Sequence, residues 1–281
     1  MRILFTIPHF FKHQDTGLYG SLIMEPEERC RSLTSCLTAL RSLYGHSQAI
    51  LHVNERAALP ANQDDTHHVD IVVCTVKNFH LLSNIGLPSS FLAHHCTDIN
   101  PLLLGFECQK VLKSYLGQYD YYCYLEDDLI LHDPWLFLKL KWFNDCVGND
   151  SLLQPNRYEM SPSGTIKKIY VDGYLRLEAT SQFQNIQNSQ TIQTNIMGRE
   201  MIFQRTTNPH SGCYFLNANQ MEEWSRKPYF LDGDTSFIGP LESAATLGIM
   251  KTFKVYKPTA ANATFLEIQH FGDLFIRKIV D

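Results

Sequence analysis

The chain has 281 residues, which is long enough for one large α/β domain or two small ones. Apolar residues make up 44% of the chain and charged residues 19%, as in an ordinary soluble globular enzyme. The formal net charge is -5, so no general electrostatic attraction to nucleic acid is expected. No stretch of about 18 apolar residues is present, and a membrane-spanning helix is therefore not expected.

The eight cysteines favour a reducing environment. None of them forms a C-x-x-C pair, and several lie inside apolar patterns, such as Cys74 and Cys123. Buried cysteine behaves as a small hydrophobic residue, so we expect free thiols and no zinc site. The apolar start of the chain is interrupted by Pro8 and lacks a small-residue cleavage site. A cytoplasmic location is therefore the expectation.

The first half of the chain alternates strand and helix patterns. Strands are predicted at 2–7, 50–53 and 69–76, and helices at 26–44 and 102–117. A polar loop is expected between the second and third strands. This alternation predicts the α/β class, with a Rossmann-like, mostly parallel sheet and helices on both of its faces. Ligands of such sheets bind at the carboxyl ends of the strands.

The second half is less regular. A polar segment at 181–195 contains five Gln and three Asn, and we expect a mobile loop there. The remaining patterns predict strands at 152–158, 168–177, 212–217 and 253–258, and helices at 218–227 and from about 240 onward. A smaller mixed sheet beside the first one is the expected outcome.

The stretch YDYYCYLEDDLILHD at 119–133 is the most informative part of the sequence. A buried strand runs directly into three consecutive carboxylates, Glu126, Asp127 and Asp128. Like charges repel one another and resist removal from water, so either a cation shares the site or the site faces solvent. Mg²⁺ and Mn²⁺ prefer oxygen ligands and use few protein carboxylates when a substrate supplies phosphates. A solvated acidic turn is the alternative interpretation.

Four segments together resemble the GT-A family of nucleotide-sugar-dependent glycosyltransferases. YLEDD at 124–128 is similar to its D-x-D motif, and SGCYFLN at 211–217 to its glycine-containing loop near the donor sugar. GPLESAATLG at 239–248 resembles its x-E-D segment, and IQHFG at 268–272 its C-terminal histidine. The sequence departs from the family pattern at Glu126, where Asp is usual, and at Ser243, where an acid is often found.

The resemblance implies a metal site. Asp128, with Glu126, would be a carboxylate ligand, and His270 would supply a nitrogen ligand, which favours Mn²⁺ over Mg²⁺. Glu126 and Asp127 would also lie near the ribose of the donor. A histidine in the protein core is the alternative interpretation of His270.

The resemblance also places the donor nucleotide. Thr6, Pro8 and His9 follow the first strand and would lie beside the nucleotide, although a plain turn at Pro8 explains them equally well. Gly212 and Cys213 would lie beside the donor sugar.

Glu242 is implied as the general base that takes the proton of an acceptor hydroxyl. The alternative is a carboxylate that only stabilises the start of a helix after Pro240. Tyr214 and Trp224 could stack on acceptor sugars, although aromatic residues at such positions are more often part of the core.

These features predict one GT-A domain over 1–281, with a nucleotide-binding half at 1–133 and an acceptor-binding half at 134–281. The expected reaction moves a sugar from a nucleotide-sugar donor, UDP-linked by expectation, to a glycan or lipid-linked saccharide. A lipid-linked acceptor would bring the enzyme to a membrane surface as a peripheral protein. The alternatives are a non-catalytic nucleotide-sugar or glycan-binding protein and a metal-dependent nucleotidyltransferase. The Gly-rich, basic loop usual in nucleotidyltransferases is not found after the first strand.

Overall fold

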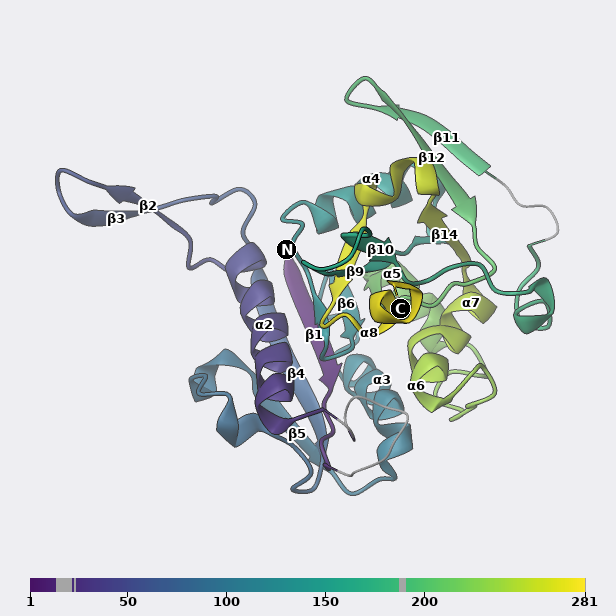
Figure 1. Ribbon diagram of the computed structural model, residues 1–281, viewed down its shortest axis with the longest axis horizontal. Helices are drawn as coiled ribbons and strands as arrows, with labels where there is room; N and C mark the ends of the chain where they lie inside the picture. The colour runs from purple at the N-terminus through teal and green to yellow at the C-terminus, as the bar shows by residue number, and fades with distance from the viewer. Residues whose placement is uncertain (14–21, 23, 187–190, 281) are drawn as a thin grey trace.

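The protein has a mixed α/β fold, shown in Figure 1. The computed structural model describes residues 1–13, 22, 24–186 and 191–280. The central sheet has five strands in the order β13-β6-β1-β4-β5. Its four parallel strands are β1 (Arg2–Pro8), β4 (His68–Val76), β5 (Ala93–Thr97) and β6 (Tyr121–Leu125), and β13 (Cys213–Asn217) lies antiparallel to β6.

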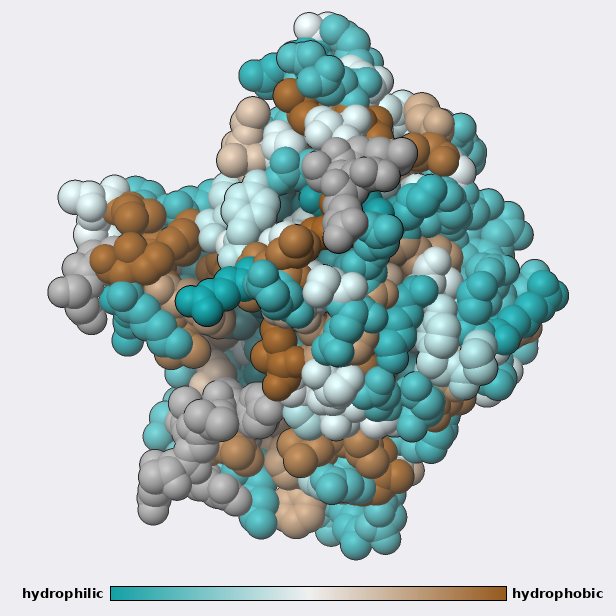
Figure 2. Space-filling view, turned by 90° about the vertical axis from the view of Figure 1, so that its right-hand side faces the viewer, coloured by the Kyte–Doolittle hydropathy of each residue, from teal (hydrophilic) through white to brown (hydrophobic). Residues whose placement is uncertain are grey.

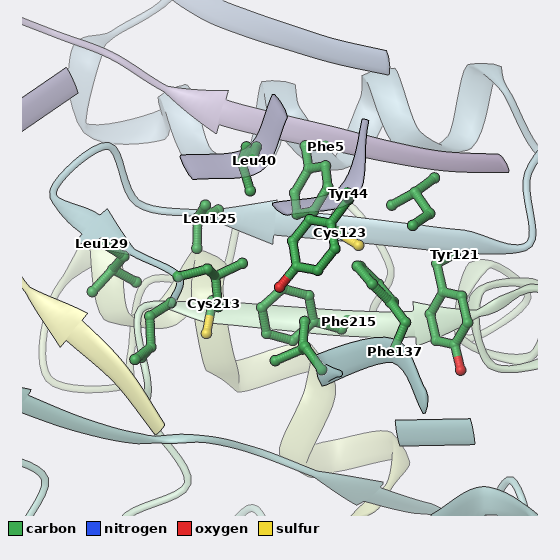
Figure 3. Close-up of a cluster of buried hydrophobic side chains, with 14 of the residues drawn as sticks. Phe5, Leu40, Tyr44, Tyr121, Cys123, Leu125, Leu129, Phe137, Cys213 and Phe215 are labelled. Carbon is green, nitrogen blue, oxygen red and sulfur yellow. The ribbon is translucent and has the colours of Figure 1, made fainter. Parts of the chain in front are cut away.

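Helices cover both faces of this sheet, as the sequence predicts. Side chains alternate along β1, so that Phe5 points to one apolar cluster and Leu4 to the other. The Phe5 face packs against α2 (Pro26–Tyr44), and the Leu4 face packs against α3 (Leu104–Ser114). Figure 3 shows the α2 side, where aromatic rings of the sheet pack edge-on against aromatic rings of the neighbouring helices.

The order of the strands creates a topological switch point between β1 and β6. From β1 the chain passes to β4 and β5 on one side, and it then crosses back to β6 on the other side. The carboxyl ends of β1 and β6 therefore lie side by side at the switch point, and open α/β sheets bind their ligands at such points. The acidic triplet directly follows β6 and lies at this position.

The second half builds two four-stranded sheets, in the orders β10-β9-β15-β7 and β11-β12-β14-β8. Both are mixed, as was expected of the smaller sheet. In the first, β15 lies parallel to β9 but antiparallel to β7, and in the second, β14 lies parallel to β8 but antiparallel to β12. The strands are β7 (Leu129–Ile130), β8 (Ser151–Leu153), β9 (Asn156–Met160), β10 (Lys168–Tyr170), β11 (Thr191–Ile196), β12 (Arg199–Arg205), β14 (Lys254–Pro258) and β15 (Glu267–His270). The helices are α4 (Leu136–Val147), α5 (Ala218–Ser225), α6 (Pro240–Glu242), α7 (Gly248–Thr252) and α8 (Leu274–Val280).

Several strand predictions differ from the structure in their bounds or their pairing. The strand predicted at 50–53 is β2 (Ala49–His52), and it does not join the central sheet. It pairs with β3 (Ala57–Pro60), inside the predicted polar loop, and the hairpin projects from the body in Figure 1. The fourth parallel strand, β5, was missed because AHHCT lacks a run of apolar residues.

In the second half, the strand predicted at 152–158 is divided at Pro155 into β8 and β9. The strand predicted at 168–177 ends at Tyr170. The loop predicted at 181–195 ends earlier, because residues from Thr191 onward form β11 and pair with β12. Its central residues, 187–190, lie outside the described part of the chain.

All eight cysteines are free thiols, and five of them are buried. Within residues 1–13, 22, 24–186 and 191–280, no helix is both long and apolar enough to cross a membrane.

Candidate active site

The three carboxylates of the triplet lie in the turn between β6 and β7, and each one has a different environment. Asp127 is 4% exposed and Glu126 is 6% exposed, whereas the Asp128 side chain is 25% exposed. Burial of adjacent like charges is costly unless cations are near. The structure supplies two such cations, Arg29 from α2 and Arg157 from β9.

Asp127 is the buried anchor of the triplet. One carboxylate oxygen is 2.5 Å from Nδ1 of His9, and the other accepts a hydrogen bond from Arg29. Nε2 of His9 accepts from the backbone N–H of Leu81, so Nδ1 carries the proton that is donated to Asp127. Burial opposes the charge of Asp127, but Arg29 and His9 outweigh it and lower its pKa. Asp127 therefore stays ionised and holds the turn in place.

Glu126 points toward Gly212, at the start of β13. A Cβ atom at position 212 would lie 2.5 Å from Oε2 of Glu126, and the φ angle of Gly212 is +63°. Only glycine fits this close approach without strain. Oε2 is 3.8 Å from Arg157, and Oε1 is buried with no hydrogen-bond partner in the described part of the chain. Burial, followed by the neighbouring charge of Asp128, raises the pKa of Glu126 to about 8.

Asp128 faces His270 of β15. Oδ2 of Asp128 lies 3.8 Å from Nε2 of His270 and 3.7 Å from Arg29, while Oδ1 is buried and has no hydrogen-bond partner among the described residues. Nδ1 of His270 is 2.9 Å from Oε1 of Glu159. Because the Glu159 carboxylate accepts this bond, Nδ1 carries the proton and Nε2 presents its lone pair toward Asp128.

These side chains fit a hard divalent cation. Oδ2 of Asp128 and Nε2 of His270 are both acceptors, and they face each other at 3.8 Å. Oδ1 of Asp128 has no hydrogen-bond partner among the described residues. Within the described ranges, no three His, Cys, Asp or Glu side chains are grouped so as to hold a metal ion alone. A ligand set completed by phosphate oxygens is the arrangement that Mg²⁺ and Mn²⁺ use with nucleotides.

Glu242 lies in the short helix α6 and interacts electrostatically with the triplet. Its charge contributes to the raised pKa of Glu126, although Glu242 follows Glu126 by 116 positions in the sequence. Oε2 of Glu242 is buried and lacks a hydrogen-bond partner within the described residues. Glu126, Asp128 and Glu242 therefore each have a buried oxygen that lacks a hydrogen-bond partner in the described part of the chain.

The other predicted donor residues are less accessible. Thr6 and Pro8 are buried in β1, and the hydroxyl of Thr6 donates to the backbone of Cys123. The side chain of Cys213 lies in the apolar cluster on the α2 side of the sheet, so at most its backbone reaches the site. The donor roles of these three residues stay predictions.

The predicted acceptor residues lie in the core. Tyr214 is fully buried and stacks on Tyr124, and Trp224 is 1% exposed and packs edge-on against Tyr214. Neither ring offers a face on which a sugar could stack in this conformation.

A buried ionic network behind Glu126 was not predicted. Asp172 accepts hydrogen bonds from Nε and one terminal nitrogen of Arg157, at 3.0 and 2.8 Å. Lys257 donates to Asp172 at 3.2 Å and also donates to the backbone oxygen of His210. Asp172 fixes the guanidinium of Arg157 and thereby places its positive charge beside Glu126.

Arg29, Arg157 and Glu159 are the main site residues that the sequence analysis missed. Arg157 and Glu159 are buried charges within a strand, and Arg29 is a buried charge on the face of α2 that also carries Leu33. A charged residue in such a position needs a partner, and this signal was present in the sequence.

Comparisons with known proteins do not identify a family. No family model matches the sequence, and no curated protein matches it. Among solved structures, the apo crystal structure of mouse xyloside xylosyltransferase 1 is 11% identical, with 91% of this chain and 85% of that chain covered and a TM-score of 0.41. The structure of CMP:2-keto-3-deoxy-manno-octonic acid synthetase complexed with CTP is 12% identical, with 91% and 89% covered and a TM-score of 0.38. At these TM-scores neither structure assigns an activity to this chain.

Proposed function

We propose that this protein is a metal-dependent glycosyltransferase that moves a sugar from a nucleotide-sugar donor to a hydroxyl group of a saccharide acceptor. The observation that carries the proposal is the acidic triplet at the topological switch point of the sheet, where Glu126 and Asp128 each have a buried oxygen without a hydrogen-bond partner among the described residues. Unsatisfied buried carboxylate oxygens are costly and indicate a missing cation or donor.

Asp128 and His270 would hold the divalent cation, together with the diphosphate of the donor. When bound, the cation would stabilise the negative charge that grows on the departing nucleoside diphosphate. Glu159 orients His270, and Asp127 keeps the turn in place through Arg29 and His9. Imidazole among the ligands favours Mn²⁺ over Mg²⁺.

Glu126 and Gly212 would lie beside the sugar end of the donor. The contact between Glu126 and Gly212 leaves no room for a side chain at position 212. With its pKa near 8, the Glu126 carboxyl group carries a proton at neutral pH before ligands bind, and it can then donate a hydrogen bond to a sugar hydroxyl.

Glu242 would act as the general base for the acceptor hydroxyl. Two observations support this role: the charge of Glu242 contributes to the raised pKa of Glu126, and Oε2 of Glu242 is buried without a hydrogen-bond partner among the described residues. Proton removal by a positioned carboxylate is an expected feature of an inverting transfer, in which the acceptor attacks the anomeric carbon directly.

The proposal is tested by incubating the protein with UDP-glucose, UDP-galactose, UDP-xylose and UDP-N-acetylglucosamine, with Mn²⁺ or with EDTA. We expect Mn²⁺-dependent release of UDP from at least one donor. A nucleotidyltransferase would instead form a nucleotide sugar and pyrophosphate from CTP or UTP and a sugar substrate. A binding protein would bind UDP with Mn²⁺ but would release none from any donor, with or without methyl glycosides as acceptors.

A further inference from the structure

Arg157 and Glu126 face each other across a gap that no hydrogen bond closes. Nη1 of Arg157 lies 3.8 Å from Oε2 of Glu126, which is beyond the range of a hydrogen bond between nitrogen and oxygen. Arg157 is 9% exposed and Glu126 is 6% exposed, so both groups have been removed from most of their water. A buried pair that stops short of a hydrogen bond is costly unless another group occupies the gap.

Arg157 is held on its side of the gap by Asp172. Nε and Nη2 of Arg157 donate to Oδ1 of Asp172, at 3.0 and 2.8 Å. Lys257 holds Asp172 in turn, because its ammonium group donates to the other carboxylate oxygen at 3.2 Å. Within the described part of the chain, Nη1 of Arg157 makes no hydrogen bond, and it is the nitrogen that faces Glu126. Arg157 therefore cannot move closer to Glu126 without losing its bonds to Asp172.

Glu126 is held on the other side of the gap by Gly212. The backbone N–H of Glu126 donates to the carbonyl oxygen of Gly212 at 2.9 Å. The carboxyl group lies against the same residue, since a Cβ atom at position 212 would be 3.0 Å from Cδ of Glu126 and 2.5 Å from its Oε2. Oε1 of Glu126 is buried and has no hydrogen-bond partner among the described residues. Both sides of the gap are therefore fixed by contacts outside it.

The gap suits one hydroxyl group of a ligand. Hydrogen bonds to a hydroxyl oxygen are about 2.8–2.9 Å long, so such an oxygen can reach both groups at once from one side of the 3.8 Å line between them. A hydroxyl group has one donor and two acceptor sites, so it can accept from Arg157 and also bond to Glu126, whether or not Glu126 carries a proton. A carboxylate or phosphate of a ligand would instead meet repulsion from an ionised Glu126.

We propose that Arg157 is a specificity-determining residue, which together with Glu126 binds one hydroxyl group of the donor sugar. This inference rests on the proposed function, in which Glu126 and Gly212 lie beside the sugar end of the donor. It narrows the substrate class to donors that carry a free hydroxyl group at this position, and it excludes their deoxy counterparts. On the side of the molecule that Figure 2 shows, where α6 lies in Figure 1, hydrophilic residues separate small hydrophobic patches, as suits a hydroxyl-rich ligand.

Donor binding without an acceptor tests this role. Calorimetry with Mn²⁺ first compares UDP, UDP-glucose, UDP-galactose, UDP-xylose and UDP-N-acetylglucosamine. The donor that binds most tightly is then compared with analogues that each lack one hydroxyl group of its sugar. We expect at least one deoxy analogue to bind about 10- to 100-fold more weakly, because it leaves buried polar groups of the protein unpaired. If every deoxy analogue binds as tightly as the parent donor, the gap takes no sugar hydroxyl group and the proposal is overturned.

Arg157→Lys then shows whether Arg157 makes the contact. Lysine keeps the positive charge beside Asp172 but has a single terminal nitrogen, so it cannot bond to Asp172 and to the sugar as arginine does. The variant should bind the parent donor about as weakly as the wild type binds the sensitive deoxy analogue, and it should bind UDP as the wild type does. An undiminished deoxy penalty in Arg157→Lys contradicts the proposal. If this variant does not fold, the deoxy series in the wild type still decides whether one hydroxyl group is recognised.

Arg205→Lys is the matched control. Arg205 lies on β12, in the other four-stranded sheet, and its guanidinium group donates to Asn185 and Gln184 at 3.0 and 3.3 Å. The same replacement there should change neither the donor affinity nor the deoxy penalty, and an equal loss in both variants contradicts the proposal. Absence of Mn²⁺-dependent UDP binding in the wild type would reject the proposed function itself. Mn²⁺-dependent UDP binding without a deoxy penalty would reject only the role of Arg157.

Discussion

His270 and Glu159 form a hydrogen bond of 2.9 Å between the imidazole Nδ1 and the carboxylate Oε1. The other oxygen of Glu159 accepts from the backbone N–H groups of Phe275 and Ile276, at 2.8 and 2.9 Å. The position of Glu159 is therefore fixed by the start of α8, and the orientation of the imidazole follows from it. The free Nε2 of His270 is directed at Asp128.

This relationship predicts the effect of Glu159→Gln. Loss of the carboxylate makes His270 a weaker and less well-oriented ligand, so the affinity for Mn²⁺ in the presence of UDP should fall about 10- to 100-fold. Calorimetry measures this affinity. The control is Glu222→Gln, which makes the same replacement at an exposed position on α5. An unchanged Mn²⁺ affinity in Glu159→Gln would show that His270 does not bind the metal.

Asp128→Ala tests the metal site itself. Without the Asp128 carboxylate, the cation loses its main protein oxygen ligand, and UDP should bind equally weakly with Mn²⁺ and with EDTA. The control is Asp98→Ala, which removes an exposed carboxylate that pairs with Lys77. Mn²⁺-dependent binding that survives in Asp128→Ala would place the cation elsewhere.

The sequence predicts the fold best where packing follows local periodicity. The apolar residues of α2 recur at helical spacing, from Leu33 to Leu40, and the predicted range 26–44 matches the helix. The strand before Glu126 is apolar throughout and lies in the middle of the sheet. In contrast, β5 lies at the edge, where exposed polar residues are tolerated, and its sequence carries little signal.

The site was less predictable because its geometry depends on long-range contacts. The sequence identifies Glu126, Asp127 and Asp128 as a group, but it does not show that Asp127 is the carboxylate that both Arg29 and His9 hydrogen-bond. Tyr214 and Trp224 have the residue types of a sugar platform, yet only the packing of α5 and β13 reveals that both are buried.

Asp172→Asn tests the buried network. Burial alone raises the pKa of Asp172, but Lys257 and Arg157 outweigh it, so the pKa lies below its ordinary value. Removal of this charge leaves two buried cations uncompensated, and the free energy of unfolding at pH 7 should fall by about 3–5 kcal/mol. Urea unfolding measures the change.

The pH dependence of this effect has a definite sign. A carboxylate with a lowered pKa stabilises the folded state above its unfolded pKa, near 4, and this contribution is lost as the pH falls below it. The difference between Asp172→Asn and the wild type should therefore be full at pH 6 and should shrink toward pH 3. A difference that stays constant over this range would show that Asp172 acts through packing.

The central claim, that Glu242 is the base of a sugar transfer, is tested most directly by Glu242→Gln. Glutamine keeps the shape of the side chain but cannot take a proton at neutral pH. The rate of transfer and the affinity for UDP with Mn²⁺ are measured in the same variant, with Glu222→Gln as the control. We predict a loss in transfer of roughly a hundredfold or more, with unchanged UDP affinity. A transfer rate near wild type, or an affinity that falls together with the rate, would contradict the account.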